Sequence, residues 1–257
     1  MKIQIVSDLH LEFQENRKWL RENPLPQAAD LLIMAGDVIP YIYRNQADEF
    51  FDTFSRDFEQ IFYVFGNHEF YRGEVNTAYP NYDELLRDNL RLLNNRSFDF
   101  AGYRFIITTL WTDIPLAERE KVQTMMNDFR LINKRTIFKE LRTFLIEDMI
   151  NYYLQSVKFL ERELAAAQDK KVIVITHHVP TYDSLPENFL KSALKYTYGN
   201  DLNYLIESNP QILAWISGHC HYPELRHKGN TLLVRNPLGY VKRGQQEKFQ
   251  PHFTIDI

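Results

Sequence analysis

Five short apolar runs, each rich in β-branched or aromatic residues, stop abruptly at a cluster of polar residues. Runs of this length and composition are typical of buried β-strands. Segments with helical periodicity separate several of them, as at residues 45–58. Alternating helices and mostly buried strands predict an α/β fold. The runs are IQIV (3–6), LLIMA (31–35), IFYVF (61–65), VIVIT (172–176) and ILAWIS (212–217).

The remaining segments predict hairpins and a helical insertion. Residues 98–111 alternate around an Ala-Gly pair, which is a hairpin signal. From about residue 114 to 169 the pattern is mainly helical, and residues 146–167 form a long amphipathic stretch. No linker rich in Gly, Pro or Ser interrupts the chain. We therefore expect a single domain over residues 1–257, with a helical insertion at about 114–169 that caps the site.

The polar clusters share an unusual composition. Six of the eight histidines lie at or just past the predicted strand ends, together with two aspartates and an asparagine. The carboxyl ends of strands in α/β sheets converge on one crevice, so five loops would deliver imidazole, carboxylate and amide groups to one place. These residues are Asp8, His10, Asp37, Asn67, His68, His177, His178, His219 and His221.

Mixed nitrogen and oxygen ligands favour first-row transition metals over the oxygen cages of calcium and magnesium. The candidate ligands are also more numerous than one tetrahedral zinc site needs, which suggests two metals bridged by a carboxylate. Each cluster alone has an ordinary explanation, such as a helix cap or a turn. An explanation that needs five such coincidences at successive strand ends is less economical than one shared metal site.

The motifs D-x-H, G-D, G-N-H-[E/D], H-H and G-H-x-H, in that order, resemble those of the calcineurin-like metallophosphoesterase superfamily. They occupy residues 8 to 221, most of the chain. The resemblance implies two mixed β-sheets packed as a sandwich flanked by helices, rather than the doubly wound sheet that the strand pattern alone suggests. It also implies a dinuclear metal site and hydrolysis of a phosphomonoester or phosphodiester.

The resemblance assigns roles motif by motif. His68 would be catalytic and face the scissile phosphate. Either His177 or His178 could reach a metal. We choose His177 as the ligand, and His178 would then either support the ligands from outside or contact the substrate. One metal would be held by Asp8, His10 and His221, the other by Asn67, His177 and His219, and Asp37 would bridge the two. The metals would be Mn, with Fe, Zn, Ni or Co as alternatives.

These roles match the needs of phosphoryl transfer, which asks a protein mainly for positioning and charge stabilisation. Two cations about 3.5–4 Å apart clamp the attacking and leaving oxygens and lower the pKa of a bridging water, which then attacks as hydroxide. His68 can give a proton to the leaving alkoxide.

Departures from the family's pattern concern the substrate. Pro40, Tyr41 and Phe65 stand where the Ser/Thr protein phosphatases carry an Asp-Arg pair and a second arginine. The chain looks more like the compact bacterial and phage enzymes, so a small-molecule or nucleotide ester is favoured over a phosphoprotein. A nuclease is a further alternative, but the net charge of −4 argues against an extended nucleic-acid surface. A non-catalytic scaffold on the same fold, like one retromer subunit, would have no need of the full ligand set.

Substrate recognition is less constrained. Arg130 in the insertion is a candidate because a guanidinium matches phosphate geometry. Arg72 and the Lys242-Arg243 pair are alternatives, and Tyr71 and Tyr240 could stack on a base or an aromatic leaving group.

The surroundings of the protein can also be anticipated. The chain has one cysteine, no signal-peptide-like start and no apolar run of membrane-spanning length. We expect a cytoplasmic protein with a phosphoester substrate and no membrane partner; protein partners are not indicated. An extended course for residues 219–221 would place His219 and His221 on one face and the thiol of Cys220 on the other.

Overall fold

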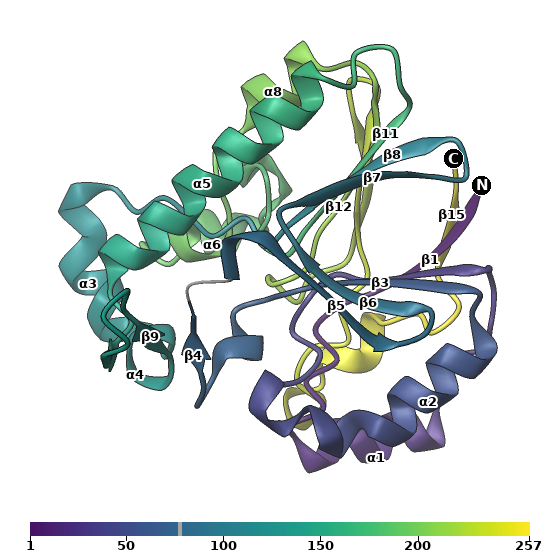
Figure 1. The fold of residues 1–257 in the computed structure, drawn as a ribbon, viewed down its shortest axis with the longest axis horizontal. Helices are drawn as coiled ribbons and strands as arrows, with labels where there is room; N and C mark the ends of the chain where they lie inside the picture. The colour runs from purple at the N-terminus through teal and green to yellow at the C-terminus, as the bar shows by residue number, and fades with distance from the viewer. Residues whose placement is uncertain (77–78) are drawn as a thin grey trace.

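Two β-sheets pack face to face in the computed structural model, which describes residues 1–76 and 79–257. Helices cover both outer faces, so the layers run helix, sheet, sheet, helix (Figure 1). Both sheets have six strands within the described residues, and both mix parallel and antiparallel pairs. The sandwich implied by the family resemblance is confirmed.

The first sheet has four parallel strands at its centre and an antiparallel strand at each edge. The chain's two ends meet here, because the last strand pairs with the first (Figure 1). In spatial order the strands are β15 (Thr254–Asp256), β1 (Lys2–Val6), β2 (Leu31–Met34), β3 (Gln60–Val64), β6 (Leu90–Asn94) and β5 (Tyr82–Arg87).

The second sheet repeats this plan, with four parallel strands between two antiparallel edges. Its strands are β13 (Glu224–Lys228), β14 (Thr231–Arg235), β12 (Ile212–Ile216), β11 (Val172–Thr176), β8 (Tyr103–Thr108) and β7 (Arg96–Phe100). The last two strands are the hairpin predicted from residues 98–111. The parallel centres of both sheets account for the continuous apolar runs in the sequence, since such strands are covered on both faces.

Three apolar layers hold the sandwich together. Between the sheets, Ile5 of β1 and Phe62 of β3 pack in one cluster with Ile173 of β11. On the outer face of the first sheet lie α1 (Gln14–Glu22) and α2 (Asp48–Asp57), and on that of the second lie α5 (Ile146–Ala165) and α8 (Asn203–Ser208). Each buried side chain contributes about 1.5–3 kcal/mol through its removal from water.

The segment expected to be a helical insertion over 114–169 divides into two parts. The long helix α5 packs through Phe159 and Leu160 on the second sheet and so belongs to the sandwich. Only the stretch before it lies beside the site, as α3 (Arg119–Met125), α4 (Asp128–Leu131), β9 (Asn133–Arg135) and β10 (Leu141–Thr143). β9 and β10 join β4 (Glu74–Val75) in a small sheet. These two strands lack the apolar alternation that would have predicted them.

No helix in the described part of the chain is both long and apolar enough to cross a membrane.

Candidate metal centre

The loops that follow five parallel strands converge at one edge of the sandwich. Backbone hydrogen bonds join them: Asp8 N donates to Gly36 O at 2.9 Å, and Gly218 N donates to His177 O at 2.9 Å. The second bond links β12 to β11, and His219 N donates across the sandwich to Asp8 Oδ1 at 3.0 Å. Hydrogen bonds therefore join the two sheets where the polar motifs lie.

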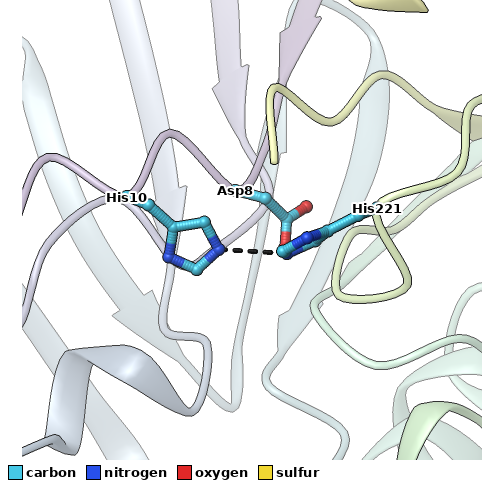
Figure 2. A group of neighbouring side chains, drawn as sticks. All are labelled: Asp8, His10 and His221. Carbon is cyan, nitrogen blue, oxygen red and sulfur yellow. Dashed lines mark hydrogen bonds and ion pairs between the residues drawn. The ribbon is translucent and has the colours of Figure 1, made fainter. Parts of the chain in front are cut away.

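A first group of side chains comes from the loops after β1 and β12. Figure 2 shows His10 and His221 facing each other with the carboxylate of Asp8 beside them. Their Nε2 atoms are 3.0 Å apart, and His221 Nε2 is 3.3 Å from Asp8 Oδ1. Asp8 and His10 are fully buried.

A second group comes from the loops after β2, β3, β11 and β12. His177 Nε2 is 3.1 Å from His219 Nδ1, 3.3 Å from Asn67 Oδ1 and 3.3 Å from Asp37 Oδ1. The amide nitrogen of Asn67 donates to Tyr71 Oη at 3.4 Å, which leaves its oxygen to face His177.

Asp37 lies between the two groups. Its Oδ1 is 3.3 Å from His177 Nε2, while its Oδ2 is 3.9 Å from His10 Nε2. Burial by itself would raise the pKa of Asp37, but the neighbouring charges of His177 and His68 outweigh it and hold the pKa well below its usual value. One carboxylate therefore directs an oxygen toward each group.

The donor atoms fit two cations. In each group imidazole nitrogens and oxygens point at a common centre, where their lone pairs repel unless a cation or proton lies between them. Burial, reinforced by His178 and His177, lowers the pKa of His219 well below its usual value. Burial also favours the neutral ring of His177, but the charges of Asp37 and Asp8 prevail and raise its pKa to about 9. Imidazole, carboxylate and amide together match a first-row transition metal.

The second nitrogen of each histidine in these groups has an acceptor. Such outer contacts fix the tautomer of a ligand and orient its ring. The pairs are His10 Nδ1 with Glu12 Oε1 at 3.2 Å, His221 Nδ1 with Gln245 Oε1 at 2.8 Å, His177 Nδ1 with Ala35 O at 2.8 Å, and His219 Nε2 with Thr197 O at 3.0 Å.

The backbone is strained where these side chains emerge. Asp8, His10, Asp37, His219 and His221 all have φ between 47° and 70°. Each such non-glycine residue costs about 1–3 kcal/mol, and strain of this kind gathers at functional sites. The expected extended course of residues 219–221 is wrong: left-handed turns at both histidines send them to different groups. Cys220 is buried beside Val179 and Leu185, as a structural thiol would be.

Two glycines are required by this packing. Gly36 has φ +86°, and a Cβ there would overlap His177 Nδ1. A Cβ on Gly66 would overlap Asp37 Oδ1. The close approach of backbone to the candidate ligands explains both residues.

His68 stands beside the two groups rather than within either. Its Nδ1 is 2.8 Å from Glu12 Oε1, and its Nε2 is 3.4 Å from Tyr240 Oη and 4.0 Å from Asp37 Oδ2. Tyr71 stacks on the ring at 4.0 Å between centroids. Burial favours the neutral ring, but the charges of Asp37 and Glu12 prevail and raise the pKa of His68 to about 9.

His178 and Arg130 lie elsewhere. His178 is 1% exposed, its Nδ1 is 3.3 Å from Thr109 O, and burial with the neighbouring His177 lowers its pKa to about 3. Its ring packs against that of His219, with 4.3 Å between the centroids, and so helps to hold this candidate ligand in place. Arg130 is exposed, and its guanidinium donates to the carbonyl of Thr124. Neither residue lines the cavity over the two groups.

Comparison with known protein families identifies the family to which these motifs belong. A family model described as calcineurin-like phosphoesterase matches residues 1–223. The chain belongs to this family. The match includes every candidate ligand as well as His68.

Similarities in sequence and in fold extend over nearly the whole chain. An uncharacterized protein of Acanthamoeba polyphaga mimivirus, L509, is 28% identical over 279 aligned positions, which cover 99% of this chain and 96% of the relative. The crystal structure of phosphopantetheinyl hydrolase (PptH) from Mycobacterium tuberculosis is similar in fold, with a TM-score of 0.67 and 16% identity over 98% of this chain and 94% of that one. A dimetal phosphatase from Danio rerio has a TM-score of 0.51 and 14% identity over 98% and 90%.

A cavity of about 790 Å³ opens over the two groups of candidate ligands. Asp37, Asn67, His68, His219 and His221 contribute to its lining. Its walls combine aromatic, thioether, cationic and acidic side chains, namely Tyr71, Tyr240, Met125, Met126, Arg72, Lys242, Arg243, Glu12 and Glu15. The alternatives to Arg130 that the sequence suggested are thus the basic groups that border the cavity.

Several supporting residues were missed from the sequence. Glu12 follows His10 by two positions and could have been found by extending the first motif. Glu69 was noted only as part of G-N-H-E. Gln245 and Asp128 carry no local signal: Asp128 is 1% exposed and accepts from Tyr71 Oη at 3.2 Å, and only the packing of α4 on the site brings it there.

Glu69 is expected to be essential for stability. Its buried carboxylate accepts hydrogen bonds from Tyr63 Oη and from four backbone amides in the loops after β2 and β3. Glu69→Ala should lower the free energy of unfolding of the metal-free protein by about 3–5 kcal/mol, because the buried donors lose their partner. Denaturant unfolding measures this.

The matched control is Glu59→Ala, which removes an exposed carboxylate just before β3. It should stay within about 0.5 kcal/mol of the parent. A loss for Glu69→Ala no larger than that of the control would contradict the assigned role.

Proposed function

We propose that the chain is a dinuclear metal-dependent phosphoesterase that hydrolyses a phosphomonoester or phosphodiester of a small molecule or nucleotide. One observation carries the proposal: Asp37 directs one oxygen toward each of two ligand groups, with His68 beside them at the cavity. Asp8, His10 and His221 would hold one cation and Asn67, His177 and His219 the other, with Asp37 shared. Manganese is the first candidate; iron, zinc, nickel and cobalt suit the same ligands.

Bound at these positions, the two cations would neutralise phosphoryl oxygens and acidify a water. The protein's own groups supply the rest. Hydrolysis forms a bond from water oxygen to phosphorus and breaks the bond from phosphorus to the leaving oxygen. His68 Nε2 gives its proton to that leaving oxygen and regains one from solvent. Tyr71, stacked on the imidazole, limits its movement.

The cavity supports a small organic ester as substrate. A volume of about 790 Å³ is in the range of small-molecule sites, and the walls offer aromatic and thioether surface to the leaving group. Arg72, Lys242 and Arg243 stand at the cavity with no carboxylate partner among the described residues. Cations in this state favour an anionic substrate.

Two residues that replace the phosphate-binding groups of the protein phosphatases, Tyr41 and Phe65, give no support to a phosphoprotein substrate. Tyr41 Oη donates to the carboxylate of Glu84 at 2.8 Å, and Phe65 stacks on Phe70 within the core. Neither side chain can replace a phosphate-binding arginine.

Metal removal tests the proposed activity. The metal-stripped protein should hydrolyse neither p-nitrophenyl phosphate nor bis-p-nitrophenyl phosphate, and Mn²⁺ should restore turnover of at least one, because the ligand groups bring no charge stabilisation of their own. Released p-nitrophenol is measured against metal content, and the preferred ester separates monoesterase from diesterase. Two bound metals without turnover of either ester under Mn²⁺, Fe²⁺, Ni²⁺ or Zn²⁺ would count against the proposal.

A further inference from the structure

Glu12 occupies a place that stability does not explain. Its Oε1 is 2.8 Å from His68 Nδ1 and 3.2 Å from His10 Nδ1, so one oxygen serves two histidines. Its other oxygen, Oε2, is buried and has no hydrogen-bond partner within the described residues. A buried acceptor left unpaired costs about 1–3 kcal/mol. A carboxylate kept in such a place calls for a functional reason.

The contact with His68 supplies that reason. An imidazole ring has two nitrogens, and the one engaged by a partner determines which other nitrogen faces the reaction. With Nδ1 held by Glu12, Nε2 is the nitrogen directed toward Tyr240 and Asp37, at the cavity. Tyr71 stacks on the ring, and the rotation of the ring is set by its two polar contacts. The contact to Glu12, at 2.8 Å, is shorter than that to Tyr240, at 3.4 Å.

We infer that Glu12 is the positioning residue of His68, holding its Nε2–H toward the oxygen of the leaving group. This inference rests on the proposed function. Glu12 touches no reacting atom and acts through the histidine. Through its contact with His10 the same carboxylate couples the position of the proton donor to that of a candidate metal ligand.

A rival role is support of the metal through His10 alone, and the two roles predict different kinetics. Proton donation matters when the leaving group is basic and hardly at all when it is a stable anion. Loss of a bound metal lowers the metal content per chain, which misplacement of His68 alone does not. The pair to compare is therefore phenyl and p-nitrophenyl phosphate, or the corresponding diesters, whichever type the parent protein hydrolyses.

Glu12→Ala should lower kcat for the phenyl ester by about 10–100-fold, the range for such supporting partners, and for the p-nitrophenyl ester by less than about threefold. With Mn²⁺ in excess, so that loss of the Glu12 contact to His10 does not empty a site, KM and metal content should be unchanged. Glu12→Gln keeps an acceptor oxygen and should recover part of the loss. Glu22→Ala, which removes an exposed carboxylate at the end of α1 outside the cavity lining, should leave the turnover of both esters unchanged.

A second measurement does not need turnover. In the protein loaded with diamagnetic Zn²⁺, the ¹⁵N-bound Nδ1 proton of His68, assigned through a His68→Asn variant, should be protected from exchange and should lose that protection in Glu12→Ala. Equal slowing of both esters, loss of a bound metal or an unchanged proton signal would each overturn the inference. A parent protein inactive on all esters would instead refute the proposed function, and the proton signal would still decide the role of Glu12.

Discussion

Asp37→Ala is expected to reduce kcat/KM by at least about a thousandfold, the equivalent of several kcal/mol of transition-state charge stabilisation. Asp37 sends one oxygen toward each ligand group, so its loss weakens both metal sites together. His68 N also donates to Asp37 Oδ1 at 2.9 Å, and the substitution frees that loop as well. Metal content should fall below two per chain, as measured by elemental analysis.

Asp169→Ala is the matched control, since this exposed aspartate precedes β11 at the end of the strand away from the site. It should leave activity and metal content unchanged. Full activity of Asp37→Ala, or loss of activity with two metals still bound and a normal fold, would show that Asp37 does not join the two sites.

His68→Asn is expected to lower kcat by about 10²–10⁴-fold, the contribution of a well-placed general acid. The asparagine amide can still donate to Glu12, so the loss of activity reports the missing Nε2 proton rather than a rearrangement of the cavity wall. Metal content and KM should stay close to those of the parent, because His68 belongs to neither ligand group. The loss should be largest with basic leaving groups.

His252→Ala, an exposed histidine outside the cavity lining, serves as the control. A His68→Asn variant that loses metal, or that slows all esters equally, would place His68 among the metal ligands instead. Undiminished turnover of the phenyl ester by His68→Asn would contradict the role of His68 as general acid.

Much of the fold could be predicted because the strand signals are local. Continuous β-branched runs identified the parallel strands at the centre of both sheets, and the resemblance of the motifs supplied the sandwich that the runs alone did not suggest. β9 and β10 went unnoticed because their short sequences, NKR and LRT, have no apolar alternation. The long helix α5 was recognised, but its place on the second sheet depends on partners such as Trp215, about 55 residues later in the sequence.

The sequence by itself determined that the side chains at the ends of five strands converge at one edge of the fold. Residues at the carboxyl ends of parallel strands must converge, since the strands run in one direction and end at one edge. The order of the motifs then sufficed to predict the family.

Only the tertiary structure decided how those side chains are paired. His177 and His178 are neighbours of the same type, and the course of the loop after β11 sends the first to Asp37 and the second against Thr109. Glu12 meets His68 across 56 positions of sequence. Such contacts depend on the twist and packing of two sheets, which no local pattern records.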